Sequence, residues 1–107
     1  MQYNVEINGK KVLITTLTNE DSNVLKDIVD VILNKMGSGL IVLANIKEDR
    51  INLIVRNNLE DKSAGDIIKF VASKLDGNGG GSKTFAQGAA KNISELEKVL
   101  KELKENM

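Results

Sequence analysis

The sequence predicts an α+β fold in which two β-hairpins form a mixed sheet and three helices pack on it, with a fifth edge strand possible. Two pairs of strand-like runs and three stretches with helical spacing of apolar residues support this class. A chain of 107 residues with 41% apolar content also has the size of one domain with one modest core. We therefore expect a single domain over residues 1–107.

The first hairpin is expected over residues 2–17. Apolar and polar residues alternate over 3–7, and the alternation resumes at 12–14. Asn8-Gly9 lies between the two runs, and this pair tolerates the positive φ angles of a type I′ turn. The pattern therefore predicts two antiparallel strands.

A first helix is expected over residues 21–36. Asn19 or Asp21 can cap its start, and Gly37 follows its end, where a left-handed residue commonly closes a helix. The apolar residues recur at helical spacing and form one face: Leu25, Ile28, Val29, Ile32 and Met36.

The second hairpin is expected from the runs at 40–46 and 51–57, which "KEDR" joins. Both runs are rich in β-branched residues, and their apolar residues are too dense for a strand with one solvated face. We therefore expect them to be central strands that are buried on both faces.

Two more helices are expected after the second hairpin. Ser63 and Asp66 have the spacing of a capping pair before an apolar face over 64–75, and Asn92 and Glu95 have it before the last helix. A stripe at such spacing more often docks a terminal helix on its own sheet, and a homodimer through this helix is the alternative. The stripe consists of Ile93, Leu96, Leu100, Leu103 and Met107.

Charge and residue usage exclude several classes of protein. The 15 basic and 15 acidic residues cancel, but residues 62–91 hold 5 basic and 2 acidic side chains. The chain has no cysteine or histidine, so it lacks disulfides, thiolate or imidazole metal ligands, and a Ser-His-Asp triad. No apolar run approaches the ~20 residues of a membrane span. We expect a cytoplasmic domain with no membrane partner.

The segment "GNGGGSKT", residues 77–84, is one residue away from a P-loop, because Ser82 stands where the last glycine belongs. A P-loop follows a strand and opens a helix, whereas a helix leads into this segment and "FAQGAAKN" is a poor helix after it. We therefore reject a nucleotide-hydrolysing site. Residues 84–90 are better suited to a short edge strand.

Two interpretations of the glycines remain. Their amides can form an anion-binding nest, with Lys83, Lys91 and Lys62 supplying charge for a nucleic-acid phosphate. Alternatively, the glycines only end one helix and cross to the next element, which composition alone favours.

The segment "NGGGSKTFAQGAAKNISELEKVL" resembles the glycine-triplet signature near the end of alanyl-tRNA synthetases, commonly written GGGRPDMAQAGG. Phe85 stands at the methionine, and Gly88 at the small residue that follows Ala-Gln. The preceding helix and strand pair also resemble that family, over about residues 24–104. The residues that match the signature are Gly79, Gly80, Gly81, Ala86 and Gln87.

The sequence departs from that signature at three places. Ser82 replaces the usual basic residue, Lys83 stands where proline is common, and Ala89-Ala90 replaces a Gly-Gly pair. The related domain of DHH phosphoesterases usually has a histidine after the triplet, and this chain has none.

The resemblance implies a DHH-associated domain, the globular tRNA-binding C-terminal part of alanyl-tRNA synthetases, so we expect a fragment of a longer alanine-tRNA ligase. Its partners would be tRNA and the other domains of the synthetase, where ATP and zinc would bind, with no cofactor, catalytic residue or metal ligand in this domain. The alternatives are a structural or dimerisation domain, and a single-strand-binding accessory domain of a DHH phosphoesterase. The expected nucleic-acid-binding residues are Lys62, Gly79, Gly80, Gly81, Ser82, Lys83, Thr84, Gln87 and Lys91.

Overall fold

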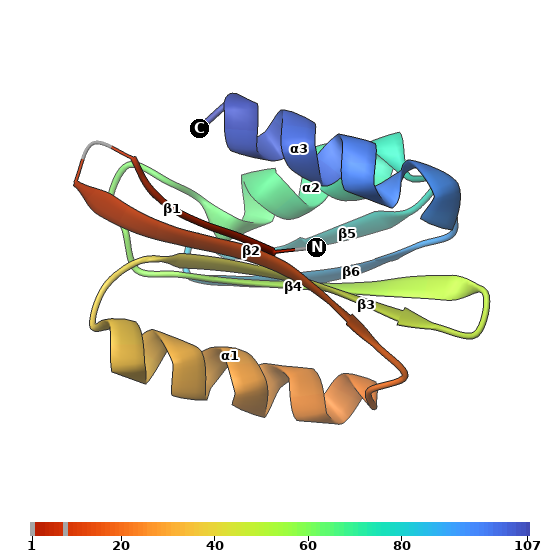
Figure 1. Cartoon of the computed structure of the whole chain (residues 1–107), viewed down its shortest axis with the longest axis horizontal. Coiled ribbons are helices and arrows are strands. Elements are labelled where there is room, and N and C mark those ends of the chain that lie inside the picture. The colour runs from red at the N-terminus through yellow and green to blue at the C-terminus, as the bar shows by residue number, and fades with distance from the viewer. Residues whose placement is uncertain (1, 8) are drawn as a thin grey trace.

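A computed structural model describes residues 2–7 and 9–107, which form a six-stranded sheet with helices on both faces (Figure 1). The helices are α1 (Ser22–Met36), α2 (Ala64–Lys74) and α3 (Leu96–Glu105), and a 3-10 turn, η1 (Ile93–Glu95), precedes α3. The strands are β1 (Gln2–Ile7), β2 (Lys10–Thr18), β3 (Leu40–Lys47), β4 (Arg50–Asn57), β5 (Asn78–Gly81) and β6 (Phe85–Ala90).

The sheet is mixed, and both expected hairpins are present. Its strand order is β1-β2-β3-β4-β6-β5, and β1 pairs antiparallel with β2 as β3 does with β4. β2 and β3 run parallel, because α1 carries the chain from the end of one strand back to the start of the next. Gly9 has a φ of 80°, which suits a tight turn, while Asn8 and the side chains of residues 3–5 and 7 lie outside the described residues.

Two apolar layers enclose the sheet, as Figure 1 shows with α1 below it and α2 and α3 above it. Ile41 and Leu43 of β3 pack towards α1, and Val42 packs towards α2 and α3. All three side chains are at most 1% exposed, so the prediction of a central strand buried on both faces is confirmed. Each such buried aliphatic side chain contributes about 1.5–3 kcal/mol to stability.

The terminal helix α3 docks on the chain's own core. Leu96, Val99, Leu100 and Leu103 are buried in the layer that α2 shares with the sheet. The helix begins later than expected, because residues 93–95 form a 3-10 turn, and Asn92 accepts a hydrogen bond from the Ser94 hydroxyl at 2.9 Å instead of capping α3. The Ser63 cap of α2 is present, with the Asp66 amide 3.5 Å from the Ser63 oxygen.

The glycine run differs from the expectation of a loop beside an edge strand. It forms β5, which is itself the edge strand, and β6 lies inside the sheet between β4 and β5. The strand order therefore corrects the prediction that residues 84–90 supply a fifth strand at the edge. The cause lies in β5, whose residues pair with β6 from Asn78↔Ala89 to Gly81↔Ala86.

Glycine is required in β5 because α2 packs directly on it. A Cβ on Gly79 would lie 2.6 Å from Ile68 Cγ2 and 2.6 Å from Gly88 Cα. A Cβ on Gly65, in the first turn of α2, would lie 2.9 Å from the Gly81 carbonyl oxygen. Gly80, between Gly79 and Gly81, faces the other side of the sheet and has nothing within 4 Å of its Cβ position.

The difference between neighbouring glycines gives a matched stability test. Gly79→Ala should lower the free energy of unfolding by roughly 1–3 kcal/mol, because the methyl group forces α2 and β6 apart. Gly80→Ala should change it by no more than about 0.5 kcal/mol, because its methyl group enters open space. Urea unfolding followed by circular dichroism measures both, and equal losses would contradict this packing of α2 on β5.

Candidate nucleic-acid interface

The turn between β5 and β6, residues Ser82, Lys83 and Thr84, is named the hairpin tip here. Its backbone carbonyls point into the protein. The Ser82 oxygen accepts a hydrogen bond from the Gly65 amide and the Lys83 oxygen accepts one from the Ala64 amide, both at 2.9 Å. These two amides start α2 and have no partner within the helix. The hairpin tip therefore occupies the helix N-terminus that would otherwise be open to an anion.

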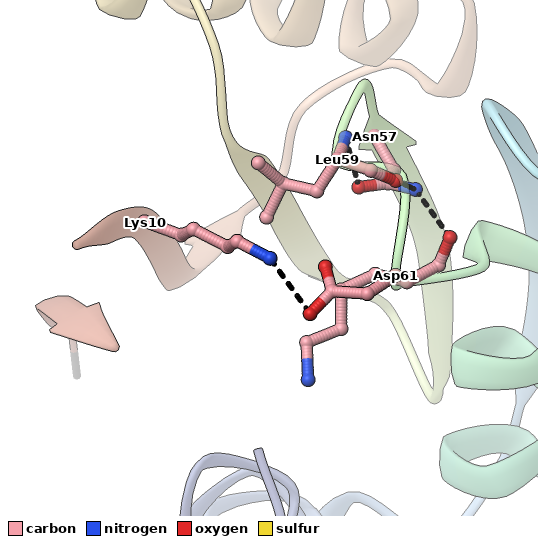
Figure 2. Close-up of polar contacts among 5 residues, drawn as sticks. Lys10, Asn57, Leu59 and Asp61 are labelled. Atoms are coloured by element: carbon pink, nitrogen blue, oxygen red, sulfur yellow. Dashed lines mark hydrogen bonds and ion pairs between the residues drawn. The ribbon is translucent and has the colours of Figure 1, made fainter. Parts of the chain in front are cut away.

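The Asn57 side chain holds the hairpin tip and the loop before α2 together, and Figure 2 shows its hydrogen bonds to the loop. Its Nδ2 donates to the carbonyls of Lys83 at 3.0 Å and Lys62 at 2.9 Å, and also to Leu59 at 3.2 Å. Its Oδ1 accepts from the Leu59 amide at 3.0 Å, and its own amide donates to Thr84 at 2.9 Å. Asn57 is 1% exposed, so these bonds replace water that cannot reach it.

Because the tip carbonyls are held inside, the opposite side of the tip faces solvent. Ser82, Lys83 and Thr84 are all exposed. The Ser82 amide donates to Phe85 at 2.8 Å, whereas the Lys83 and Thr84 amides have no partner among the described residues. Two adjacent amides beside a lysine side chain form a small donor group suited to a phosphate oxygen.

The glycine triplet does not form a nest. A nest needs alternating right- and left-handed residues, whereas residues 78–81 are a strand, and the glycines with φ between +20° and +160° are Gly9, Gly37 and Gly39 in the described part of the chain. Since Ser82 bonds Phe85, the antiparallel alternation turns the amides of Gly79 and Gly81 towards the open edge of the sheet. The available donors are therefore those of a strand edge and a turn.

The three predicted lysines are divided between two places. The backbones of Lys62 and Lys83 come together beside the hairpin tip, where the Asn57 side-chain amide donates to both of their carbonyls. Lys91 follows the opposite end of β6, roughly 20 Å away for a six-residue strand at about 3.3 Å per residue. None of the three takes part in an ion pair between described residues.

Lys10 forms an ion pair with Asp61, the acid next to Lys62 in the sequence. Its Nζ lies 2.8 Å from Asp61 Oδ2, an ion pair that Figure 2 shows beside Asn57. The hydrogen bond from Lys10 lowers the pKa of the Asp61 carboxyl, and the charge of Lys62 lowers that pKa slightly further. The Asp61 carboxylate is thus engaged on the side of Lys10, and the Lys62 ammonium is left without an ion pair.

Gln87 lies on the exposed face of β6, directly opposite Gly80. Its side chain has no intramolecular hydrogen bond among the described residues, so it does not tie the glycine run to the sheet. Phe85 packs against the α1 layer, with the Lys26 ammonium 5.5 Å from its ring centre. Gln87 is available to a ligand, whereas Phe85 belongs to the core.

Sequence reasoning missed Asn57 and Lys10, and it singled out no role for Arg50, the first residue of β4. Asn57 ends an apolar strand and carries no local motif, and Lys10 meets Asp61 across 51 residues of chain, so neither has a sequence signal. Arg50 lies in the "KEDR" turn, where a charged residue is ordinary. No helix of the described residues is both long and apolar enough to cross a membrane, and they contain no group of three acidic side chains placed to hold a metal.

The fold and the site define a small α+β domain built around a glycine-rich edge hairpin, and not a P-loop domain. The chain belongs to the DHHA1 domain family, whose model matches residues 9–107.

Two known proteins show the extent of the similarity. The alanine–tRNA ligase of Clostridioides difficile (strain 630) is 33% identical over 100 residues, which cover 90% of this chain and 11% of that protein. The chain thus spans about a tenth of the length of the relative it matches. The crystal structure of the C-Ala domain from Aquifex aeolicus alanyl-tRNA synthetase superposes with a TM-score of 0.83 at 24% identity, over 98% of this chain and 96% of that one. This match confirms the predicted fold class.

The role of Asn57 can be measured by removing its side chain. Asn57→Ala should lower the free energy of unfolding by on the order of 3 kcal/mol, because the carbonyls of three residues, all at least partly buried, lose their donor. Asn52→Ala, on the same strand and half-buried, should cost less than about 1 kcal/mol. Urea unfolding compares the two variants, and similar losses would rule out the special role of Asn57.

Proposed function

We propose that this chain is the tRNA-binding C-terminal domain of an alanine-tRNA ligase, and that it holds the RNA backbone at the hairpin tip. The observation that carries the proposal is the inward anchoring of the tip carbonyls by Asn57 and α2. This anchoring leaves the Lys83 and Thr84 amides without a hydrogen bond, and the ammonium groups of Lys62 and Lys83 without an ion pair, among the described residues. The similarity to an alanine–tRNA ligase supports tRNA as the ligand.

The groups at the tip recognise charge and backbone shape and carry little sequence information. Amides and ammonium groups bind phosphate oxygens, whereas base-specific reading needs side chains that reach base edges. On β6, Gln87 is the exposed side chain that could form hydrogen bonds with a base edge. Few phosphates can be engaged by so few charges, so the isolated domain should bind weakly and with a strong dependence on salt.

The rest of the enzyme would supply the chemistry. In this proposal the domain supports aminoacylation and editing of tRNA-Ala by the full-length ligase in the cytoplasm. ATP and zinc bind in its other domains, which are the protein partners of this one. The domain itself contributes RNA contacts and no cofactor site.

A homodimer through α3 is the second candidate from the sequence, and the fold gives it no support. The apolar stripe of α3 is already buried within the chain, since the Leu100 side chain is 0% exposed and that of Leu103 is 5% exposed. Leu100→Glu would therefore report on folding and not on dimerisation. The apolar residues that remain exposed on α1, Val24 and Val31, are too few for a stable interface.

Binding of tRNA to the 107-residue chain tests the proposal. Lys83→Gln should weaken binding of labelled tRNA roughly two- to fivefold, the effect of one exposed ion pair, and should lower the slope of log K against log salt by about 1. Lys98→Gln makes an equal change in charge on the exposed face of α3, and it should leave the affinity and the salt slope unchanged. Fluorescence anisotropy over a series of salt concentrations measures both quantities. Absence of tRNA binding by the unmodified chain even at low salt would refute the proposal.

A further inference from the structure

A cleft lies at the end of the glycine hairpin that is opposite the tip. It has a volume of about 340 Å³ and is called the end cleft here. It is lined by the start of β4, the turn from α2 into β5, and the last residues of β6: Arg50, Asp76, Gly77, Asn78, Ala89, Ala90 and Lys91. The end cleft thus collects side chains from three distant parts of the sequence.

Two cations in the end cleft have no ion pair in the described part of the chain. Arg50 and Lys91 are exposed, and neither takes part in an ion pair between described residues. Arg50 stands opposite Lys47 in the β3–β4 pair, and Lys47 binds Asp21 at 2.6 Å, so that carboxylate is already engaged. A guanidinium and an ammonium facing one cleft are the groups that proteins use for phosphate.

Two backbone amides in the lining of the end cleft are already bonded inside the protein, so recognition there depends mainly on the side chains. The Gly77 amide donates to the Ala72 carbonyl at 2.9 Å, and the Lys91 amide donates to the Leu75 carbonyl at 3.0 Å. Asp76 is the one acid of the cleft, and its φ of 59° is a conformation that asparagine also tolerates. Its carboxylate opposes an anion without pairing with either cation.

An uncovered strip of sheet connects the end cleft to the hairpin tip. Gln87 and Ala89 of β6 are exposed on the α1 side of the sheet, beyond the part that α1 covers. Their partners across the strand pair are Gly80 and Asn78, and no atom lies within 4 Å of the Gly80 Cβ position. The strip is made of small or polar residues, and it lies between the end cleft and the hairpin tip, which are roughly 20 Å apart at about 3.3 Å per residue of β6.

From this arrangement we infer that the end cleft is a second phosphate-binding site, formed by Arg50 and Lys91, and that an RNA backbone runs along the strip between it and the hairpin tip. The inference rests on the proposed function for the identity of the ligand as RNA. It extends that function by adding Arg50, and by dividing the RNA contacts between two sites that are separated by the length of β6. Lys91 belongs to the end cleft and not to the tip.

Salt-dependent tRNA binding tests the inference with charge variants of opposite sign. Arg50→Gln and Lys91→Gln should each weaken tRNA binding about two- to fivefold and reduce the salt slope by about 1, as Lys83→Gln does at the other site. Asp76→Asn should strengthen binding by a similar factor, because it removes the opposing charge and keeps a residue that tolerates this φ. Lys98→Gln is the control for net charge. If tRNA binds and responds to Lys83→Gln but to none of the end-cleft variants, the inference fails and the proposed function stands.

Inorganic phosphate gives a readout that does not depend on RNA. Titrated into labelled protein at low salt, it should shift the NMR amide signals of Gly77, Asn78 and Lys91, and Arg50→Gln should abolish these shifts while those of the hairpin tip persist. Absence of the end-cleft shifts in the unmodified chain would overturn the inference. Phosphate shifts at the cleft without any tRNA binding would refute RNA as the ligand and, with it, the proposed function.

Discussion

The buried carboxamide of Asn57 is the contact on which the exposed hairpin tip depends. It joins the end of β4, the loop that leads into α2 and the turn between β5 and β6, by five hydrogen bonds counted with its own backbone amide. A buried polar group without partners destabilises a protein, so the three segments are fixed relative to one another. The backbone amides of the hairpin tip therefore keep a constant arrangement. Their positions are fixed by the contact with Asn57 and do not depend on the stiffness of the turn itself.

The sequence predicted the regular elements well, because their burial leaves a periodic pattern. β3 is apolar at every position from Leu40 to Ala44 because both of its faces are covered there, and the apolar face of α2 repeats at helical spacing. The glycine run left no such pattern. Glycine has no side chain to show which face is buried, and the strand forms because β6 and Ile68 of α2 can approach it closely.

The site was only partly predictable for a related reason. The glycines, Ser82 and Lys83 form a local motif that can be recognised from its order and spacing. Asn57 and Lys10 reach the hairpin tip, and Arg50 reaches the end cleft, through the fold, from positions 25 to more than 70 residues earlier in the chain. Charge counts also hide which cations are available, because Lys10 and Lys47 form ion pairs with acids, whereas Lys62 and Lys83 form none with the residues that the structure describes. Pairing of this kind is decided by tertiary structure and not by composition.

The close approach of Gly65 to Gly81 also affects whether the edge of the sheet can pair with a strand of another protein molecule. A strand at the border of a sheet ordinarily invites another polypeptide to add to it and so start aggregation. Here the first turn of α2 lies against the carbonyl of Gly81, at the distance where even a methyl group would collide. An incoming strand would meet that helix at the Gly81 end of the border, so the same packing that needs glycine limits how far such a strand could pair.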